Sequence, residues 1–297
     1  MLKYFLFGIF CVQSIWISAQ TDNDPIYVNY NFFPSRDFDK VDGSATYQQV
    51  EANVILPGFN LGKKTKVYTN LNYKVNSYDF EDTGTDVYPT TLNDFRLGFI
   101  VRHQVSDIFE LILAPRINVR SDFEEKFSKR DLFPSAHLLG LRTHKQNPNL
   151  IYGLGVSYNN EGIKNLVIPI GILQYKNEDI RIYTIIPSFA YIMLTPSEKF
   201  EYGLSVNLEA GLFHIDRFSL DNSPNYLRTS NVTIAPTLGY KFYKDFWFNF
   251  RAGYAMPGNY QLLDADFEAV PYWKKNKLAD SFSIMAGVSL RVKEKQD

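Results

Sequence analysis

The sequence is poor in the residues that build disulfide frameworks, metal centres and basic binding surfaces. Its 297 residues include 1 Cys and 4 His, and Lys+Arg 31 nearly balance Asp+Glu 32. One cysteine excludes a disulfide framework, and balanced charge excludes the basic surface that nucleic acids require. No uncharged apolar stretch after residue 19 reaches the ~18 residues of a membrane-spanning helix. The chain instead has 24 Phe and 20 Tyr, so it can bury a large apolar surface and is not disordered.

The N-terminus has the pattern of an export signal. A short basic start precedes an apolar stretch over 4–12, and Ile17-Ser18-Ala19 precedes Gln20 like a signal-peptidase site. The stretch is shorter than the ~20 residues that span a bilayer. The sequence therefore predicts a cleaved signal peptide, 1–19, and an exported mature chain, 20–297, without cysteine.

Strict alternation of apolar and polar residues dominates the mature chain. From Phe200 to Leu212 every even position is apolar, and every odd position is Glu, Gly, Ser or Asn. This run exceeds the ~5–6 residues of an ordinary strand and suits a membrane-crossing strand of ~9–11 residues. Comparable segments lie at 44–56, 65–77, 92–104, 107–119, 134–143, 150–160, 165–175, 180–193, 199–213, 228–242, 245–257 and 280–292.

Two features favour a transmembrane barrel over a soluble sandwich, which alternation alone does not separate. The polar face is rich in Gly, Ser, Asn and Thr, which suits a crowded lumen. Aromatics gather near segment ends, as interfacial girdles require. These aromatics are Tyr73, Tyr78, Tyr158, Tyr175, Phe200, Tyr202, Tyr240, Phe242, Phe246, Trp247 and Tyr254.

The predicted fold is therefore an all-β, antiparallel transmembrane β-barrel of about 12 strands, with a range of 10–14. Long connections near 78–91, 120–133, 214–227 and 258–279 do not all fall on one side when twelve strands are counted alternately. Either one strand in the middle is miscounted, or 25–33, within a lead-in segment over 20–43, is itself a strand.

Several short motifs resemble those of a known family. They are Ala19-Gln20, Ala114-Pro115-Arg116, Ile168-Pro169-Ile170-Gly171, Ile186-Pro187-Ser188 and Ala235-Pro236-Thr237-Leu238-Gly239-Tyr240. Together with the length, they resemble the outer-membrane β-barrels of Bacteroidota-type bacteria, including one catalogued as a domain of unknown function. The resemblance implies an outer-membrane location in a Gram-negative cell.

The last segment resembles the signal that barrel-assembly machinery reads. Gly287, Leu290 and Val292 have the spacing of that signal, although Met285 replaces a preferred polar residue. An ordinary alternating strand explains the same pattern. The resemblance implies two partners, outer-membrane lipid and the assembly machinery.

A search for catalytic and metal-binding patterns gives negative results. The runs 155–159 and 203–207 begin like a nucleophile elbow but lack its closing glycine and lie in strands. The four histidines show no metal-ligand spacing. The sequence predicts no catalytic residue, no metal and no cofactor, and the solute stays unidentified.

The polar face of the segments supplies candidate lumen residues. A lipid-facing Arg or Lys would cost ~2–4 kcal/mol at the midplane, so these charges are expected inside. The lumen-lining candidates are Lys74, Arg96, Arg102, Glu110, Arg116, Glu201, Glu209, Arg251 and Arg291. They form either a structural network that fills a narrow interior or a solute path whose selectivity they set.

The predicted function is passive. The chain is expected to be a narrow channel, a transporter of small or lipophilic molecules, or a barrel whose loops do the work. The alternatives are a barrel enzyme that acts on lipid, which needs a histidine beside a nucleophile, and a soluble exported β-protein that binds glycan.

Overall fold

The computed structural model describes residues 24–83, 89–160, 165–216, 225–270 and 276–292. The predicted signal peptide, 1–19, lies outside these residues. The described chain is all-β apart from one 3-10 turn, η1 (Lys129–Asp131). None of the described residues forms a helix long and apolar enough to cross a membrane.

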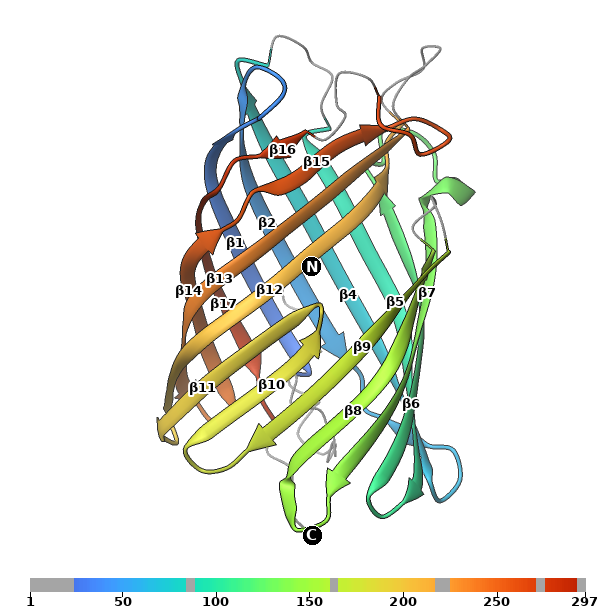
Figure 1. The fold of residues 1–297 in the computed structure, drawn as a ribbon, viewed down its shortest axis with the longest axis vertical. Helices are drawn as coiled ribbons and strands as arrows, with labels where there is room; N and C mark the ends of the chain where they lie inside the picture. The colour runs from blue at the N-terminus through green and yellow to red at the C-terminus, as the bar shows by residue number, and fades with distance from the viewer. Residues whose placement is uncertain (1–23, 84–88, 161–164, 217–224, 271–275, 293–297) are drawn as a thin grey trace, which may run out of the picture.

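The strands close into one antiparallel barrel of 14 strands (Figure 1). β1 closes it, because β1 pairs with both β2 and β17. In spatial order the barrel strands are β1 (Ile26–Asp37), β2 (Ser44–Ile55), β4 (Thr65–Glu81), β5 (Thr91–Ser106), β6 (Phe109–Ser121), β7 (Leu132–His144), β8 (Asn147–Asn160), β9 (Asn165–Lys176), β10 (Ile180–Ile186), β11 (Phe189–Ser197), β12 (Phe200–His214), β13 (Tyr226–Tyr243), β14 (Phe246–Ala255) and β17 (Ser281–Leu290). Three shorter strands lie in connections: β3 (Phe59–Asn60), β15 (Gly258–Leu263) and β16 (Lys277–Leu278).

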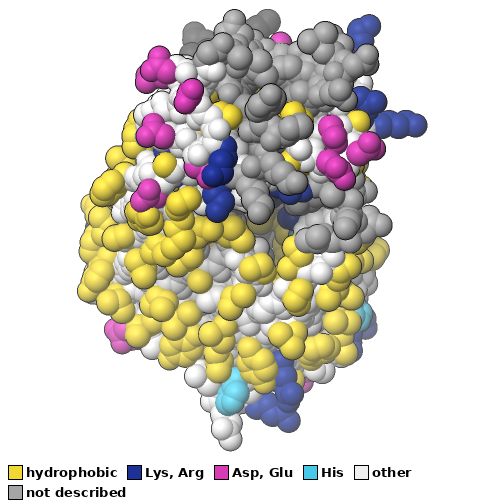
Figure 2. Space-filling view, turned by 45° about the horizontal axis from the view of Figure 1, so that its top comes forward, with side chains coloured by type: hydrophobic (Ala, Val, Ile, Leu, Met, Phe, Trp, Pro, Cys, Tyr) yellow, Lys and Arg dark blue, Asp and Glu magenta, His cyan; other side chains and the backbone are white. Residues whose placement is uncertain are grey.

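The outer face carries the apolar half of each alternating strand. Leu154 is 77% exposed and Phe282 71%, and Val167 on β9 is 65% exposed. Figure 2 shows hydrophobic side chains in a broad band across the face in view, with most of the charged side chains beyond its two edges. An outward apolar band on a closed barrel is the architecture of outer-membrane proteins.

Two strands account for the difference between 12 and 14. Residues 26–37 form β1, so the lead-in segment does contain a strand. The interpretation of 180–193 as one strand is wrong, because β10 and β11 form a hairpin there with Pro187 and Ser188 at its tip. Both faces of this segment are apolar, so the periodicity gives no sign of the turn.

The corrected count resolves the sidedness of the connections. The four long connections noted in the sequence, bounded by the strands as 82–90, 122–131, 215–225 and 256–280, now all join strand ends at one end of the barrel, here called the loop end. Short turns such as 107–108 and 244–245 lie at the other end, the turn end, where β1 begins and β17 finishes. This is the sidedness expected of a bacterial barrel.

Four prolines that fall within the strand segments predicted from sequence, Pro115, Pro169, Pro187 and Pro236, lie where ladder pairing is interrupted. Pro115 has no pair in β5, and Pro236 has none in β14, although the register is the same on both sides of each interruption. Pro187 is at the β10–β11 tip, and Pro169 lies on β9 beyond its last pair with β10. Proline has no N–H to donate, so it is tolerated at such edges.

The wall is interrupted above the β10–β11 hairpin. β10 has 7 residues and β11 has 9, whereas β12 has 15 (Figure 1). Among the described residues, β9 has no partner on its β10 side from 167 to 170, and β12 has none on its β11 side from 209 to 213. At the loop end β12 meets β6 instead, where His214 pairs with Ser121. We call this interruption of strand pairing between β9 and β12 the wall gap.

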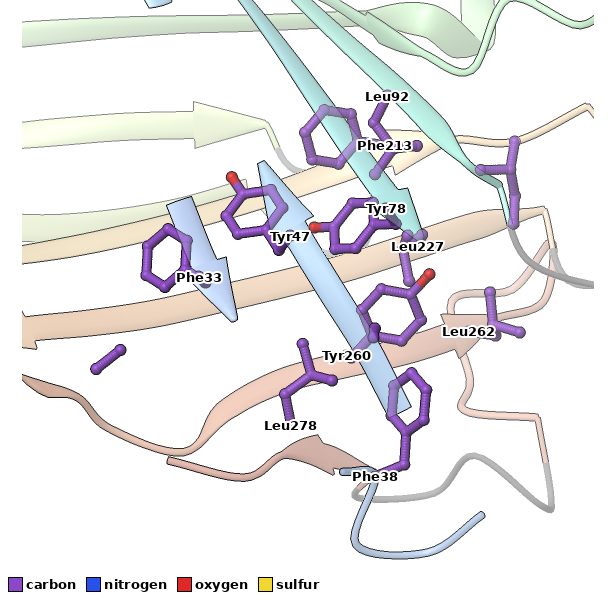
Figure 3. Packing of buried hydrophobic residues seen from close by; sticks show 13 residues of the cluster. Phe33, Phe38, Tyr47, Tyr78, Leu92, Phe213, Leu227, Tyr260, Leu262 and Leu278 are labelled. Atoms are coloured by element: carbon purple, nitrogen blue, oxygen red, sulfur yellow. The ribbon is translucent and has the colours of Figure 1, made fainter. Parts of the chain in front are cut away.

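An apolar cluster fills the barrel interior at the loop end (Figure 3). Tyr47 and Tyr78 stack at 4.8 Å between ring centroids, and Tyr260 of β15 contacts Tyr78 at 5.5 Å. Tyr260 is 0% exposed. This aromatic cap comprises Phe33, Phe38, Ala45, Tyr47, Tyr78, Leu92, Phe213, Ile215, Leu227, Ala255, Tyr260, Leu262 and Leu278.

Candidate functional site

Eight of the nine lumen-lining candidates occupy the strand positions that alternate with the outward apolar residues, and Arg291 continues this alternation one residue beyond β17. Their contacts are consistent with that placement. Arg102 and Glu110 form a two-bond pair at the turn end, with Nη2 to Oε2 at 2.6 Å. Arg96 donates to Asn118 at 2.9 Å, and Arg116 donates to Ser135 at 2.8 Å.

Strand register builds a row of alternating charge across four strands. Glu51 of β2 lies opposite Lys74 of β4, Lys74 opposite Asp94 of β5, and Asp94 opposite Arg120 of β6. The Arg120 Nε–Asp94 Oδ2 distance is 3.0 Å, and the Lys74 Nζ–Glu51 Oε2 distance is 3.8 Å. Directly opposed unlike charges stabilise a ladder by about 0.2–1 kcal/mol each.

Glu209 links this row to the facing wall. Its carboxylate accepts from Lys74 at 3.3 Å and from Gln49 at 3.3 Å, although it belongs to β12 and they belong to β4 and β2. Both donors therefore reach across the lumen. The barrel interior is narrow at this level, because side chains from opposite walls touch.

A second charged cluster lies at the turn end. Glu201 Oε1 accepts from Arg291 Nη1 at 2.7 Å and from Arg181 Nη2 at 3.0 Å. The Arg291 guanidinium also lies 4.2 Å from the Trp247 ring centroid and 3.1 Å from Asp24. Glu201 is 3% exposed, so one buried carboxylate holds two guanidinium groups.

Two aromatics assigned from sequence to the girdles lie inside. Tyr78 belongs to the aromatic cap, and Trp247 packs on Arg291. The sequence interpretation of these two is wrong, because proximity to a strand end does not report which face of the strand a residue occupies.

The inner face of β7–β11 differs from the rest of the interior. Leu141, Ile170, Ile172 and Tyr183 are buried together there. The partly buried side chains packed against them are Ile112, Leu139, Ile151, Ile185, Phe189 and Tyr191. We call β7–β11 the apolar half of the inner wall, and β12–β14, β17, β1, β2 and β4–β6 the charged half.

A cavity of about 450 Å³ is lined by residues of both halves. Phe189, Tyr191 and Met193 of β11 belong to the apolar half, and Glu209 of β12 and Arg251 of β14 belong to the charged half. The lining extends to Phe189 and Ala190, the first residues after the hairpin tip. The cavity therefore reaches the tip of the β10–β11 hairpin, which borders the wall gap.

Arg251 stands apart from the other charges that line the cavity. Within the described part of the chain, its guanidinium has no hydrogen bond or ion pair, whereas Asp24, Glu51, Glu201 and Glu209 each contact a partner. Its five N–H donors are thus available to a molecule in the cavity.

No catalytic arrangement forms at the two serine motifs. Ser205 Oγ contacts Thr237 Oγ1 at 2.8 Å. Ser157 accepts from Asn159 at 3.0 Å and lies opposite His137 across the β7–β8 ladder. In the described residues His137 Nδ1 has no partner, so no carboxylate orients this ring.

One group of metal-capable donors exists among the described residues: Asp131, His214 and Asp216. His214 Nδ1 lies 2.9 Å from Asp131 Oδ1 and 3.5 Å from Asp216 Oδ1. One ring nitrogen of His214 thus lies between two carboxylates. Because Asp131 belongs to η1 and His214 ends β12, their contact connects η1 to the end of β12. Burial opposes the charged form of Asp131, but donors from the Ser128 backbone and His214 outweigh it and lower the pKa of this carboxyl.

The assembly-signal candidates lie at the closing seam of the barrel. Gly287 and Leu290 belong to β17, where they pair with Asn29 and Ile26 of β1, and Val292 follows the strand. A side chain at Gly287 would clash with the Asn29 side chain and the Val28 carbonyl. Close approach of β1 and β17 is therefore one reason for glycine here.

Sequence reasoning missed charged residues of the interior, among them Glu51, Asp94, Arg120 and Arg181. Asp94 and Arg120 share the polar positions of β5 and β6 with residues that were selected, so parity alone could have identified them. No candidate was selected from β2, to which Glu51 belongs. Arg181 lies in the segment that is apolar on both faces, where no signal was available.

Comparison with solved structures finds outer-membrane barrels at very low sequence identity. A porin, NanC, matches with 8% identity and TM-score 0.38, covering 90% of this chain and 100% of that chain. An outer-membrane channel from Pseudomonas putida F1 matches with 9% identity and TM-score 0.44, covering 91% and 97%.

LpxR from Salmonella typhimurium matches with 9% identity and TM-score 0.36, covering 90% and 100%. No curated protein matches in sequence. One family model, however, spans nearly the whole chain, over residues 15–291. The chain therefore belongs to the family described as Domain of unknown function (DUF6268).

Proposed function

We propose that this protein is an outer-membrane channel that passes small solutes between its lumen and the membrane side of its wall. The observation that carries the proposal is the contrast between an interior that is filled at the loop end and a wall whose strand pairing is interrupted between β9 and β12. The aromatic cap fills the interior at the loop end, while the cavity reaches Phe189 and Ala190 beside the wall gap.

Backbone chemistry supports a hydrated opening in the wall gap. Unpaired N–H and C=O groups at membrane depth are tolerated only where they line water or protein. The free edge of β9 lies at the level of Val167, within the outer apolar band. The edge groups of β9 and β12 therefore need water or polar solute groups between them.

Reconstitution tests whether the barrel conducts. Purified protein in planar bilayers should give single-channel currents of low conductance, and proteoliposomes should swell in small solutes. Silence at all voltages together with absence of swelling would contradict the channel.

A blocking experiment tests the route through the wall. The only cysteine is Cys11, within the predicted signal peptide, so an introduced cysteine is unique in the mature chain. Ala190→Cys carrying a bulky maleimide should lose most solute flux. Leu154→Cys, exposed on the lipid face of β8, is the matched control and should retain it. Equal flux through both labelled variants would place the path elsewhere.

Export, source and partners are part of the same proposal. The chain would be cleaved after Ala19 and inserted into the outer membrane of a Gram-negative, Bacteroidota-type bacterium by barrel-assembly machinery that reads Gly287, Leu290 and Val292. Mass spectrometry of the mature N-terminus and heat-modifiable migration of the membrane fraction test this. A protein that stays soluble without detergent contradicts it and favours the glycan-binding alternative.

We also propose that the barrel is not an enzyme. His137 lies opposite Ser157 of one serine motif, but no hydrogen bond joins them within the described residues. Hydrolysis of phospholipid vesicles that disappears in Ser157→Ala would overturn this assignment.

A further inference from the structure

We propose that the cavity binds a small amphipathic anion, with its carboxylate on Arg251 and its apolar body against Phe189 and Tyr191. The proposal deepens the proposed function, because it treats the cavity as the solute site. Three observations carry it: the absence of a direct partner for Arg251 among the described residues, the apolar side chains of β11, and the strand register that joins the two.

The pairing of the charges that line the cavity indicates the sign of the ligand. The carboxylates that line the cavity are all engaged: Glu201 by Arg291 and Arg181, Glu209 by Lys74 and Gln49. Glu51 accepts from Asn72 at 2.8 Å and from Tyr27 at 3.0 Å. Arg251 is the lining charge without such a contact among the described residues.

The chemistry of the arginine favours a carboxylate. A guanidinium presents a planar fork of donors that matches the two oxygens of a carboxylate, so a bidentate pair forms with defined geometry. Glu209, Glu51 and Asp24 lie near enough to attract the Arg251 charge but form no hydrogen bond with it among the described residues, so its N–H donors can still pair with an incoming anion. A cationic ligand would be repelled by the guanidinium, and a neutral carbonyl would accept only a weaker hydrogen bond that is not charge-assisted at both ends.

The apolar side chains of β11 indicate that the rest of the ligand is apolar. Phe189 and Tyr191 stack beside Tyr183 on β10 and β11, with ring centroids 6.2 Å apart, and Met193 follows on the same face. A hydrated inorganic anion gains nothing from such a surface, whereas an aromatic or aliphatic body buries apolar area there.

Register places both surfaces within reach of one small molecule. Met193 pairs with Gly203, Gly203 with Thr237, and Thr237 with Arg251, so these residues form one row across β11–β14. Three strand spacings make about 14 Å. Because Gly203 has no side chain and that of Thr237 is short, nothing bulky in this row separates Met193 from Arg251.

Equilibrium binding to the full-length barrel in detergent tests the proposal, with benzoate as the probe. Benzamide keeps the ring without the charge, acetate keeps the charge without the ring, and benzylammonium reverses the charge. Benzoate should bind at least tenfold more tightly than any of the three. Equal binding of benzoate and benzamide overturns the proposal, and equal binding of acetate reduces the site to a simple anion site.

Substitutions test which residues bind the carboxylate and which bind the ring. Arg251→Gln should abolish the preference for benzoate over benzamide, and Arg251→Lys should restore part of it. Phe189→Ala should weaken benzoate and benzamide alike. Arg102→Gln, which alters an arginine paired with Glu110 outside the cavity lining, is the matched control. Heat-modifiable migration verifies that each variant is folded.

The outcomes separate this inference from the proposed function. If Arg251→Gln retains the preference for benzoate, the proposed anion site is wrong. Swelling of proteoliposomes in neutral solutes can still support the channel in that case. If the unmodified protein neither conducts nor swells liposomes, the channel fails whatever benzoate does.

Discussion

The charged half and the apolar half of the inner wall are built from the same kind of strand but solve different problems. In the charged half, register sets opposite charges side by side, as in the row from Glu51 to Arg120. In the apolar half, Ile170, Ile172 and Tyr183 pack on one another inside the barrel. Specific ion pairs and hydrogen bonds stabilise the charged half, whereas buried apolar surface stabilises the apolar half. Substitutions in the two halves should therefore destabilise the barrel in different ways.

The largest effect is expected where one carboxylate serves two arginines. Glu201→Ala leaves Arg181 and Arg291 without their shared acceptor, and breaking a buried ion pair costs about 3–5 kcal/mol. Reversible urea unfolding in lipid vesicles measures the loss. A loss below about 1 kcal/mol would mean that water replaces the carboxylate and that the charged half is not held by its pairs.

Truncation in the apolar half should follow packing rather than charge. Ile172→Ala removes a side chain that is 6% exposed and should destabilise the barrel by about 2–5 kcal/mol, independent of salt. Leu154→Ala on the lipid face is the control and should cost less. Equal losses in both variants would show that the inner apolar side chains are loosely packed.

The rim where β12 meets β6 should respond to pH. Because hydrogen-bond donors lower the pKa of Asp131, its contribution is present above the ordinary carboxyl pKa and is lost as the pH falls through its depressed value. Asp131→Asn should cost about 1–3 kcal/mol at neutral pH and nothing at a pH where the native carboxyl is protonated. A pH-independent difference would contradict the charged role.

The smallest effect is expected at an exposed pair in a turn. Lys241 and Asp245 lie 3.4 Å apart at the turn end, with the Asp245 side chain 49% exposed. Lys241→Ala should change stability by less than about 1 kcal/mol, and high salt should remove the difference. A larger loss of stability would mean that exposed ion pairs at the turn end stabilise the barrel as strongly as the buried pairs of the charged half.

The sequence alone determined where most strands lie and which face of each points outward. Alternation in 199–213 and 228–242 is a local property of the strand, and a lipid-facing charge is too costly to tolerate. It therefore located β12 and β13 and the inward position of residues such as Glu201 and Arg251.

Only the tertiary structure decided what depends on closure and register. Alternation carries no information where both faces are apolar, so β10 and β11 were interpreted as one strand and the wall gap was not foreseen. The pairing of Glu209 with Lys74 across the lumen, the aromatic cap and the unpartnered Arg251 join strands that are distant in sequence. Their contacts exist only once the barrel has closed between β1 and β17, because closure fixes which side chains face one another across the interior.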